Sequence, residues 1–181
     1  CIRDRKNNLL KDAWKGGNAD DMLSVWDTQL ADYGAIIVDR RRRYLDALNE
    51  LAAKAHSDIS GGREKLELGY DTPLTSDGVD ALRAELYDKL EEAREKDKKL
   101  GYCTVGPHRD DIDIVINGLD GRKFASQGQQ RTIALAMKIG EVGLFEKESG
   151  EPPVLLLDDV LSELDGERRR ILLDITRGVQ T

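Results

Sequence analysis

Cysteine, histidine and aromatic side chains are scarce in this sequence. It has two Cys, Cys1 and Cys103, and two His among 181 residues. Two thiols do not make a disulfide framework, so we expect a reducing, cytoplasmic compartment. Aromatic residues make up 5% of the chain and charged residues 35%. That balance favours long solvated helices over a compact β-sandwich.

Long apolar runs are also missing. No stretch approaches the ~18 consecutive apolar residues of a membrane-spanning helix, and no signal peptide is visible. The net charge of −7 does not attract nucleic acid to the fold as a whole, so DNA binding would need a local basic patch. The chain starts at Cys1 and stops in GVQT, which leads us to expect a piece of a longer protein.

The first hundred residues predict a helical arm domain, 1–100. Residues from about 22 to 55 contain no Pro and one Gly, and their apolar side chains recur at steps of three, four or seven. A second helix is expected over about 79–100 with a solvated end, and residues 65–70 alternate like a strand. The predicted apolar stripe of the first helix is Trp26, Leu30, Tyr33, Ile37, Tyr44, Leu48, Leu51 and Ala55.

Residues 101–181 predict a mixed α/β domain. The alternation of 111–121 predicts a strand, paired in a hairpin with RKFAS at 122–126, and residues 127–145 read as a buried helix. In PPVLLLDD, four apolar residues (154–157) run into Asp158 and Asp159. This pattern indicates a buried parallel strand. Carboxylates at such strand ends often hold Mg²⁺ beside a nucleotide phosphate, and the alternative is that the two Asp residues only cap the following turn. A last helix is expected from about Gly166.

A phosphate loop does not accompany that strand. The pattern G-x-x-x-x-G-K-[ST] has one near match, from Gly101 to Gly106, but Pro107 and His108 follow it instead of Lys and a hydroxyl residue. Pro107 also removes a backbone donor that such a loop needs. On its own, the chain is therefore predicted to have no ATPase activity.

A second anion-binding pattern is present in FASQGQQRT, residues 124–132. Ser126 and Gln129 have the spacing of a capping box, and most such matches only begin a helix. The same geometry presents free N–H groups and a partial positive charge to a phosphate, and Gly128 would allow close approach. The two interpretations are compatible, because one hydroxyl can both cap a helix and contact a ligand.

The order of these motifs resembles the second half of an ATP-binding-cassette (ABC) head, a P-loop NTPase. The Ser126 helix start matches the signature motif, the strand with Asp158 and Asp159 matches Walker B, and SELD, ending at Asp165, matches the D-loop. Together with GPHRDD at 106–111 and VWDTQLADYGAIIVDRRRRYL at 25–45, they resemble the RecF family of bacterial DNA-repair ATPases. The likeness spans nearly the whole chain.

The resemblance implies that the phosphate loop lies in a preceding segment and that two heads sandwich ATP and Mg²⁺ in a homodimer. It implies that Asp158 holds Mg²⁺ through water and that Asp159 orients or deprotonates the attacking water. Ser126, Gly128 and Gln129 would contact the γ-phosphate held by the opposite head. Asp165 would lie at the dimer seam.

The same resemblance implies a function in recombinational repair and replication. The full-length protein would be an ATP-gated clamp on duplex DNA near a single-strand junction, aiding recombinase loading with RecR as a partner. The alternative is a non-catalytic scaffold or interaction module like those of chromosome-maintenance (SMC) proteins, although the arm is short for their coiled coils. A two-metal nuclease would need more clustered acids and His than the sequence has.

Several charged residues keep two interpretations. Arg40, Arg41 and Arg43 are candidates for DNA contact, but a basic run on a helix is usually a solvated face paired with nearby acids, here Asp39 and Asp46. His108 and Arg109 are expected to be structural members of a loop. His56 is expected at the surface near a helix end.

Overall fold

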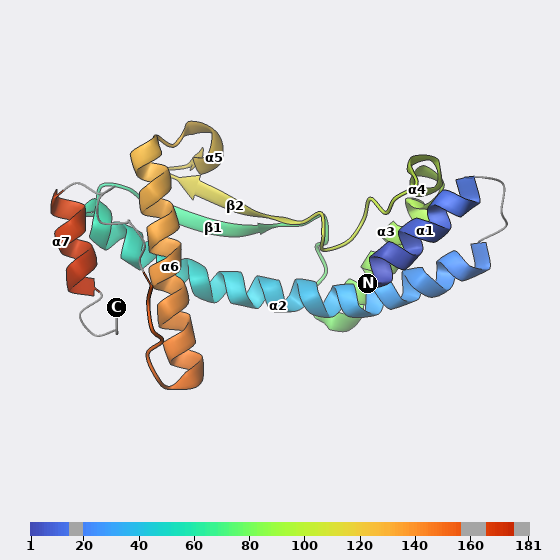
Figure 1. Cartoon of the computed structure of the whole chain (residues 1–181), viewed down its shortest axis with the longest axis horizontal. Coiled ribbons are helices and arrows are strands. Elements are labelled where there is room, and N and C mark those ends of the chain that lie inside the picture. The colour runs from blue at the N-terminus through green and yellow to red at the C-terminus, as the bar shows by residue number, and fades with distance from the viewer. Residues whose placement is uncertain (15–19, 157–165, 176–181) are drawn as a thin grey trace. The chain divides into compact units, whose positions relative to one another are not determined.

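The structure is a computed structural model that describes residues 1–14, 20–156 and 166–175. It is a mixed α/β chain, mainly helical with a small sheet (Figure 1). Among the described helices none is long and apolar enough to cross a lipid bilayer. In chain order the elements are α1 (Ile2–Trp14), α2 (Asp20–Ser60), β1 (Leu66–Asp71), α3 (Val79–Glu92), α4 (Arg94–Leu100), β2 (Asp111–Ile116), β3 (Leu119–Asp120), α5 (Gly121–Phe124), α6 (Gln127–Ser149) and α7 (Gly166–Ile175).

The chain forms two compact units, each made of two separate segments. The first unit comprises Cys1–Arg43 and Tyr70–Asp111, and the second comprises Tyr44–Gly69 and Ile112–Thr181. Helix α2 contributes its first part to one unit and its last part to the other. The expected division into an arm, 1–100, and a head half, 101–181, follows chain order and stays a prediction.

The first unit is held together by small and branched apolar residues where α2 meets α3. Its buried cluster contains Ala31, Ala35 and Val38 of α2, and Leu82, Leu86 and Leu90 of α3. A Cβ at Gly34 would lie 2.5 Å from Leu86 Cδ2, so the Leu86 side chain would have to shift to accommodate any larger residue at this position.

Helix α2 confirms the long amphipathic helix, but its predicted buried face is wrong in its first half. Tyr33, Ile37 and Tyr44 are 59%, 41% and 45% exposed. The small residues of α2 face the core instead, because they let the neighbouring helix approach closely. The buried positions are Leu23, Asp27, Ala31, Gly34, Ala35, Val38, Leu45, Leu48, Ala52, Ala55, His56, Ile59 and Ser60.

The second predicted helix is interrupted. Helix α3 ends at Glu92 and α4 begins at Arg94, with Ala93 between them, so a single helix over 79–100 is wrong. Its polar end is not wholly solvated either, since Asp97 in α4 is 0% exposed. Gly101 closes α4 in the left-handed conformation at φ 73°, which favours glycine.

The second unit contains a three-stranded sheet in the order β1-β2-β3. Strands β2 and β3 are antiparallel, with Ile116 opposite Leu119. Asn117 and Gly118 form the turn between them, with φ of 50° and 79°, as a two-residue hairpin with an Asn-Gly turn requires. The hairpin itself was predicted, but its partner is Leu119–Asp120. The expected strand at RKFAS is wrong.

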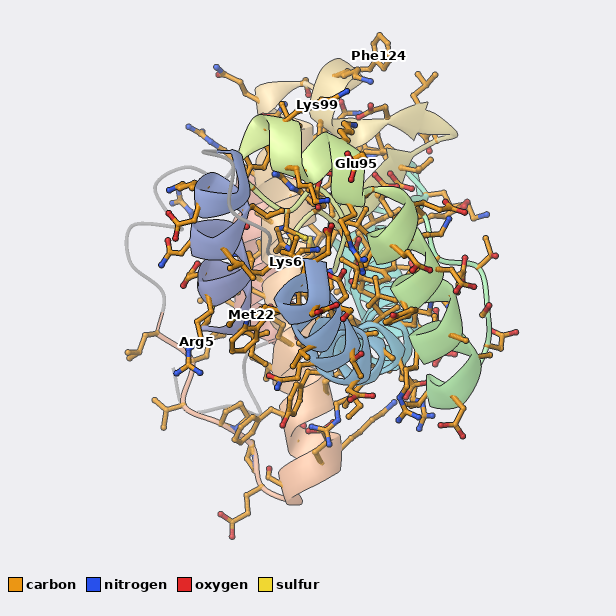
Figure 2. All side chains as sticks on the ribbon, turned by 90° about the vertical axis from the view of Figure 1, so that its right-hand side faces the viewer. Arg5, Lys6, Met22, Glu95, Lys99 and Phe124 are labelled. Carbon is orange, nitrogen blue, oxygen red and sulfur yellow. The ribbon has the colours of Figure 1, made fainter. Side chains whose placement is uncertain are left out.

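That segment is helical because Asp120 caps it. The Asp120 carboxylate accepts hydrogen bonds from the backbone N–H groups of Arg122 and Lys123, which begins the short helix α5. Phe124 ends this helix and is 67% exposed (Figure 2). A capped turn therefore replaces the strand that the sequence pattern predicted.

Helix α6 confirms the buried helix expected at 127–145 and packs against the last part of α2. A Cβ at Gly140 would lie 2.9 Å from Leu48 Cδ1 and 3.0 Å from the backbone N of Ala52. Figure 1 shows α6 crossing this part of α2. Strand β1 is fixed to the same stretch of α2, because Asn49 Oδ1 accepts a 2.7 Å hydrogen bond from the Leu68 N–H.

The strand predicted at 154–157 is not formed where the structure describes it. Residues 154–156 have no regular secondary structure, and Leu156 is 87% exposed. A parallel strand requires a neighbouring strand to pair with, and the described sheet offers this segment none. Leu157 lies outside the described residues. The last helix, predicted from Gly166, is confirmed as α7.

Candidate functional site at the start of helix α6

The start of α6 is a complete capping box. Ser126 Oγ accepts a 3.3 Å hydrogen bond from the backbone N–H of Gln129, and Gln129 Oε1 accepts a 2.8 Å hydrogen bond from the backbone N–H of Ser126. The first regular helical bond follows at once, from Gln130 N–H to the Ser126 carbonyl oxygen at 2.9 Å. The capping interpretation of this motif is therefore confirmed.

The capping box leaves two donors open at the helix end. Within the described part of the chain, the backbone N–H groups of Gln127 and Gly128 have no hydrogen-bond acceptor. Ser126 is itself exposed, and its hydroxyl can donate outward while it accepts from Gln129. With the positive end of the helix dipole behind them, these groups suit an oxyanion.

The Gln129 side chain is engaged on both sides. Its Oε1 belongs to the capping box, and its Nε2 donates a 2.9 Å hydrogen bond to Glu64 Oε1. Glu64 Oε2 in turn lies 3.6 Å from Nε2 of His56. The His56 side chain is 0% exposed, so the expectation of a surface His56 is wrong.

Glu64 was not singled out by sequence reasoning. It lies two residues before β1, between a Gly-Gly turn and an alternating strand, and nothing in GGREKLEL marks one acid as special. The sequence signal that could have found Glu64 is the Gly-Gly turn at the end of α2. A turn that reverses the chain brings the residues after it back beside the helix before it.

The arginine run divides between structural and exposed roles. Arg41 Nη1 donates to the Pro107 carbonyl oxygen at 2.5 Å and to Tyr70 Oη at 3.3 Å. Arg43 pairs with Asp39 at 2.9 Å, which confirms one expected partner, and Arg40 is exposed. DNA contact by Arg40, Arg41 and Arg43 stays a prediction.

Arg42, which was not among the candidates, turns toward the protein. It donates to the backbone carbonyl oxygens of Ser76, at 2.6 Å, and of Leu74. Four consecutive helical residues point in four directions, and here at least one of them ties α2 to the loop before α3. The run is therefore not a uniform basic surface.

The loop at 106–111 makes structural contacts. His108 Nε2 lies 3.2 Å from the Cys103 carbonyl oxygen, and Arg109 donates to the same oxygen at 3.3 Å. Partial burial lowers the pKa of His108. Tyr70 donates a 2.6 Å hydrogen bond to Asp110, and burial followed by this bond raises the pKa of Tyr70 to about 12. These contacts agree with the expected structural loop.

A buried ionic cluster in the first unit was not predicted. Lys6 Nζ lies 2.6 Å from Asp27 Oδ1 and 3.7 Å from Asp97 Oδ2, and all three side chains are 0% exposed. Arg94 completes the cluster through a 3.0 Å bond to Asp27. Figure 2 shows Lys6 inside this helical cluster and Lys99 at its edge on α4. The four charges balance, which indicates a structural role.

The remaining predicted site residues are the three aspartates of the Walker B and D-loop motifs. Asp158, Asp159 and Asp165 lie outside the described residues. Among the residues that are described, no group of three or more His, Cys, Asp or Glu side chains could hold a metal ion. The metal-binding and catalytic assignments therefore stay predictions.

Comparison with known proteins places this geometry in context. No family model matches the chain. The DNA replication and repair protein RecF of Agathobacter rectalis is 48% identical over 177 residues, which cover 98% of this chain and 47% of that protein. RecF of Microcystis aeruginosa is 49% identical over 154 residues, which cover 84% of this chain and 41% of that protein.

A solved structure agrees with these relatives. The recombination mediator protein RecF with ATP, of the RecFOR pathway, has a TM-score of 0.88 and 40% identity over 99% of this chain and 48% of that chain. A second RecF structure, with the ATP analogue ATPrS, has a TM-score of 0.89. The chain thus spans about half the length of the proteins it matches.

The fold and its match to an ATP-bound structure define the class: a mixed α/β part of an ABC-type ATPase. Identity of 40–49% across the aligned region identifies the relatives within that class. The chain therefore resembles the RecF family over nearly its whole length.

Proposed function

We propose that the full-length protein is an ATP-gated DNA-binding ATPase of recombinational repair and replication, and that this chain supplies the signature half of its head. The observation that carries the proposal is the start of α6. It has two open backbone donors and an exposed Ser126 hydroxyl, in a chain similar to ATP-bound RecF. Open donors at a helix start fit a phosphate oxygen of ATP.

In this proposal, Ser126, Gly128 and Gln129 act on the γ-phosphate held by a second head. Their role is to close an ATP-dependent homodimer, because each head carries a signature helix start for the other head's nucleotide. Asp165 would lie at the seam between the heads. Closing this seam around DNA would make the dimer a clamp.

The Walker B pair would complete the site. Carboxylates are preferred Mg²⁺ ligands, so Asp158 would hold the ion through water and Asp159 would orient or deprotonate the attacking water. The bound ion would supply charge neutralisation for phosphoryl transfer. A RecR-like mediator and duplex DNA near a single-strand junction are the proposed partners, in keeping with the RecFOR pathway named for the solved relatives.

The substitution Ser126→Arg in the full-length protein tests the proposal. It fills the space at the helix start and removes the cap. If Ser126 is only a cap, the loss is about 0.5–2 kcal/mol of stability with nucleotide responses preserved in the folded fraction. If Ser126 acts in trans, the variant still binds ATP, but dimerisation, hydrolysis and ATP-dependent DNA retention fail together.

Mixing supplies the control. A dimer of one Ser126→Arg head and one head with a defective phosphate loop has both lesions in one composite site and leaves the other site whole. The mixture should regain part of its activity, measured as ATP hydrolysis and as dimer mass by light scattering. If both proteins are folded and the mixture regains no ATP hydrolysis and no dimer mass, Ser126 is only a helix cap. That result is the one expected of a non-catalytic scaffold.

A further inference from the structure

The turn after α2 carries an acidic side chain to the start of α6. Helix α2 ends at Ser60, and Gly61 and Gly62 follow with φ of 64° and 72°. The Gly62 N–H donates to the Ser57 carbonyl oxygen at 2.8 Å, so the turn is anchored to the helix. Glu64, whose side chain is 16% exposed, emerges from this turn and reaches Gln129 at 2.9 Å.

The carboxylate decides which way the Gln129 amide points. An ionised carboxylate only accepts hydrogen bonds, so it must face the NH₂ end of the amide. That leaves Oε1 of Gln129 to accept from the Ser126 N–H, at 2.8 Å. In the opposite orientation, two donors would meet at Ser126 and two acceptors at Glu64, so both bonds would be lost.

The orientation of the Gln129 amide decides which groups at the start of α6 remain available as hydrogen-bond donors. With the Ser126 N–H satisfied and Ser126 Oγ accepting from the Gln129 N–H, the hydroxyl hydrogen is free to point away from the helix. The N–H groups of Gln127 and Gly128 add two more donors. The result is a preorganised set of donors, which is what oxyanion stabilisation requires.

We propose that Glu64 is a positioning residue for the signature motif: by fixing Gln129 it holds the donors of the α6 start ready for the γ-phosphate of a nucleotide on the opposite head. The inference rests on the proposed function. The fully buried His56 ring, in the last turns of α2, lies 3.6 Å from the second carboxylate oxygen of Glu64. The hydrogen bond that ties Glu64 to the helix start is the one from Gln129 to its first carboxylate oxygen.

The packing of α6 supports the same role. Gly140 and Ala52 hold the middle of α6 against α2, and the Gln129–Glu64 bond fixes its first turn beside the end of that helix. One contact is with α2 itself and the other is with Glu64, four residues after α2 ends, so α6 is attached both to this helix and to the turn that follows it. Removing the Glu64 side chain should make the first turn of α6 less rigid without unfolding the helix.

The experiment uses the full-length protein with Mg-ATP as the probe and light scattering to follow dimerisation. Glu64→Ala should raise the protein concentration for half-maximal ATP-driven dimerisation by roughly 10- to 100-fold, the scale of a hydrogen bond to a charged group. ATP affinity of the isolated head should not change, since the proposed phosphate loop lies elsewhere. Glu64→Gln should recover most of the loss, because its amide oxygen still accepts from Gln129.

Two controls separate positioning from a general structural effect. Glu67→Ala removes an exposed acid that forms an ion pair with Lys65, at 2.5 Å, and should leave dimerisation unchanged. Mixing Glu64→Ala heads with phosphate-loop-defective heads should restore part of the hydrolysis, which places the lesion on the signature side. A merely structural defect would instead lower the melting temperature and the ATP affinity of the isolated head.

The outcomes remain distinguishable from those of the Ser126 test. If Ser126→Arg abolishes dimerisation but folded Glu64→Ala dimerises like wild type, the positioning role is wrong and the proposed function stands. Glu64→Gln performing no better than Glu64→Ala would overturn the acceptor argument. If Ser126→Arg also leaves dimerisation intact, the proposed function itself fails.

Discussion

The two compact units bury polar groups in different ways. In the first unit, Lys6 and Arg94 meet Asp27 and Asp97, and the charges balance inside the protein. In the second unit, the polar chain from His56 through Glu64 to Gln129 ends at an exposed helix start with open donors. A closed network of this kind supports structure, whereas a network that ends in unsatisfied donors at the surface is suited to bind a ligand.

The largest expected effect is in the closed network. Lys6→Met should leave Asp97 with a buried charge and no cation, and breaking such a pair costs about 3–5 kcal/mol of unfolding free energy. Chemical denaturation followed by circular dichroism measures this loss. Lys99→Met, on the exposed side of α4, is the matched control and should change stability by less than about 0.5 kcal/mol.

A double variant sharpens that test. Adding Asp97→Asn to Lys6→Met removes the unpaired charge and should return part of the lost stability, because the two side chains belong to one network. If Lys6→Met costs no more than the Lys99 control, the cluster does not stabilise the unit and the contrast between the units disappears.

The second unit should be most sensitive where α6 meets α2. Gly140→Ala places a Cβ 3.0 Å from the Ala52 backbone, and such overpacking costs about 1–3 kcal/mol. A Cβ at Gly143 would meet the end of the Leu51 side chain at 3.4 and 3.8 Å, so Gly143→Ala should gain up to about 1 kcal/mol of helix propensity. Thermal unfolding of both variants measures the difference, and equal shifts would contradict the close packing.

The smallest effect concerns Tyr70. Its pKa of about 12 in the folded protein exceeds the ordinary value of about 10. The folded state therefore favours the neutral phenol, so this contribution to stability is complete below about pH 10 and is lost as the pH rises toward 12. Ultraviolet titration of tyrosinate should show one late-titrating phenol that Tyr70→Phe removes. Titration of this phenol near pH 10 would contradict both its burial and its contact with Asp110.

Sequence reasoning succeeded where local chemistry decides the structure. The long helix α2 and the Ser126 cap depend on periodicity and on one hydroxyl. It failed at RKFAS because an alternation rule was applied where a single carboxylate, Asp120, begins a helical turn instead. The small residues of α2 face the core because α3 packs closely against them, and the sequence of α2 alone does not show this.

The candidate site was predicted in part for the same reason. Ser126 and Gln129 were recognised because their spacing is local, whereas Glu64 acts on Gln129 across 65 positions of the chain. The buried Lys6 and Asp97 belong to segments that look solvated when each is considered alone. Pairing of distant charges depends on the fold, so a single sequence without an alignment does not reveal it.

The interleaved units have a consequence for the order of folding. Asn7 holds the Cys103 backbone N–H across 96 positions, and Lys6 lies beside Cys103 across 97. During synthesis, α1 must therefore wait until Cys103 has left the ribosome, which at about 5–20 residues per second takes roughly 5–20 s. Because such long-range contacts slow folding, we expect nascent chains ending before residue 97 to expose α1 and to rely on chaperones until α4 emerges.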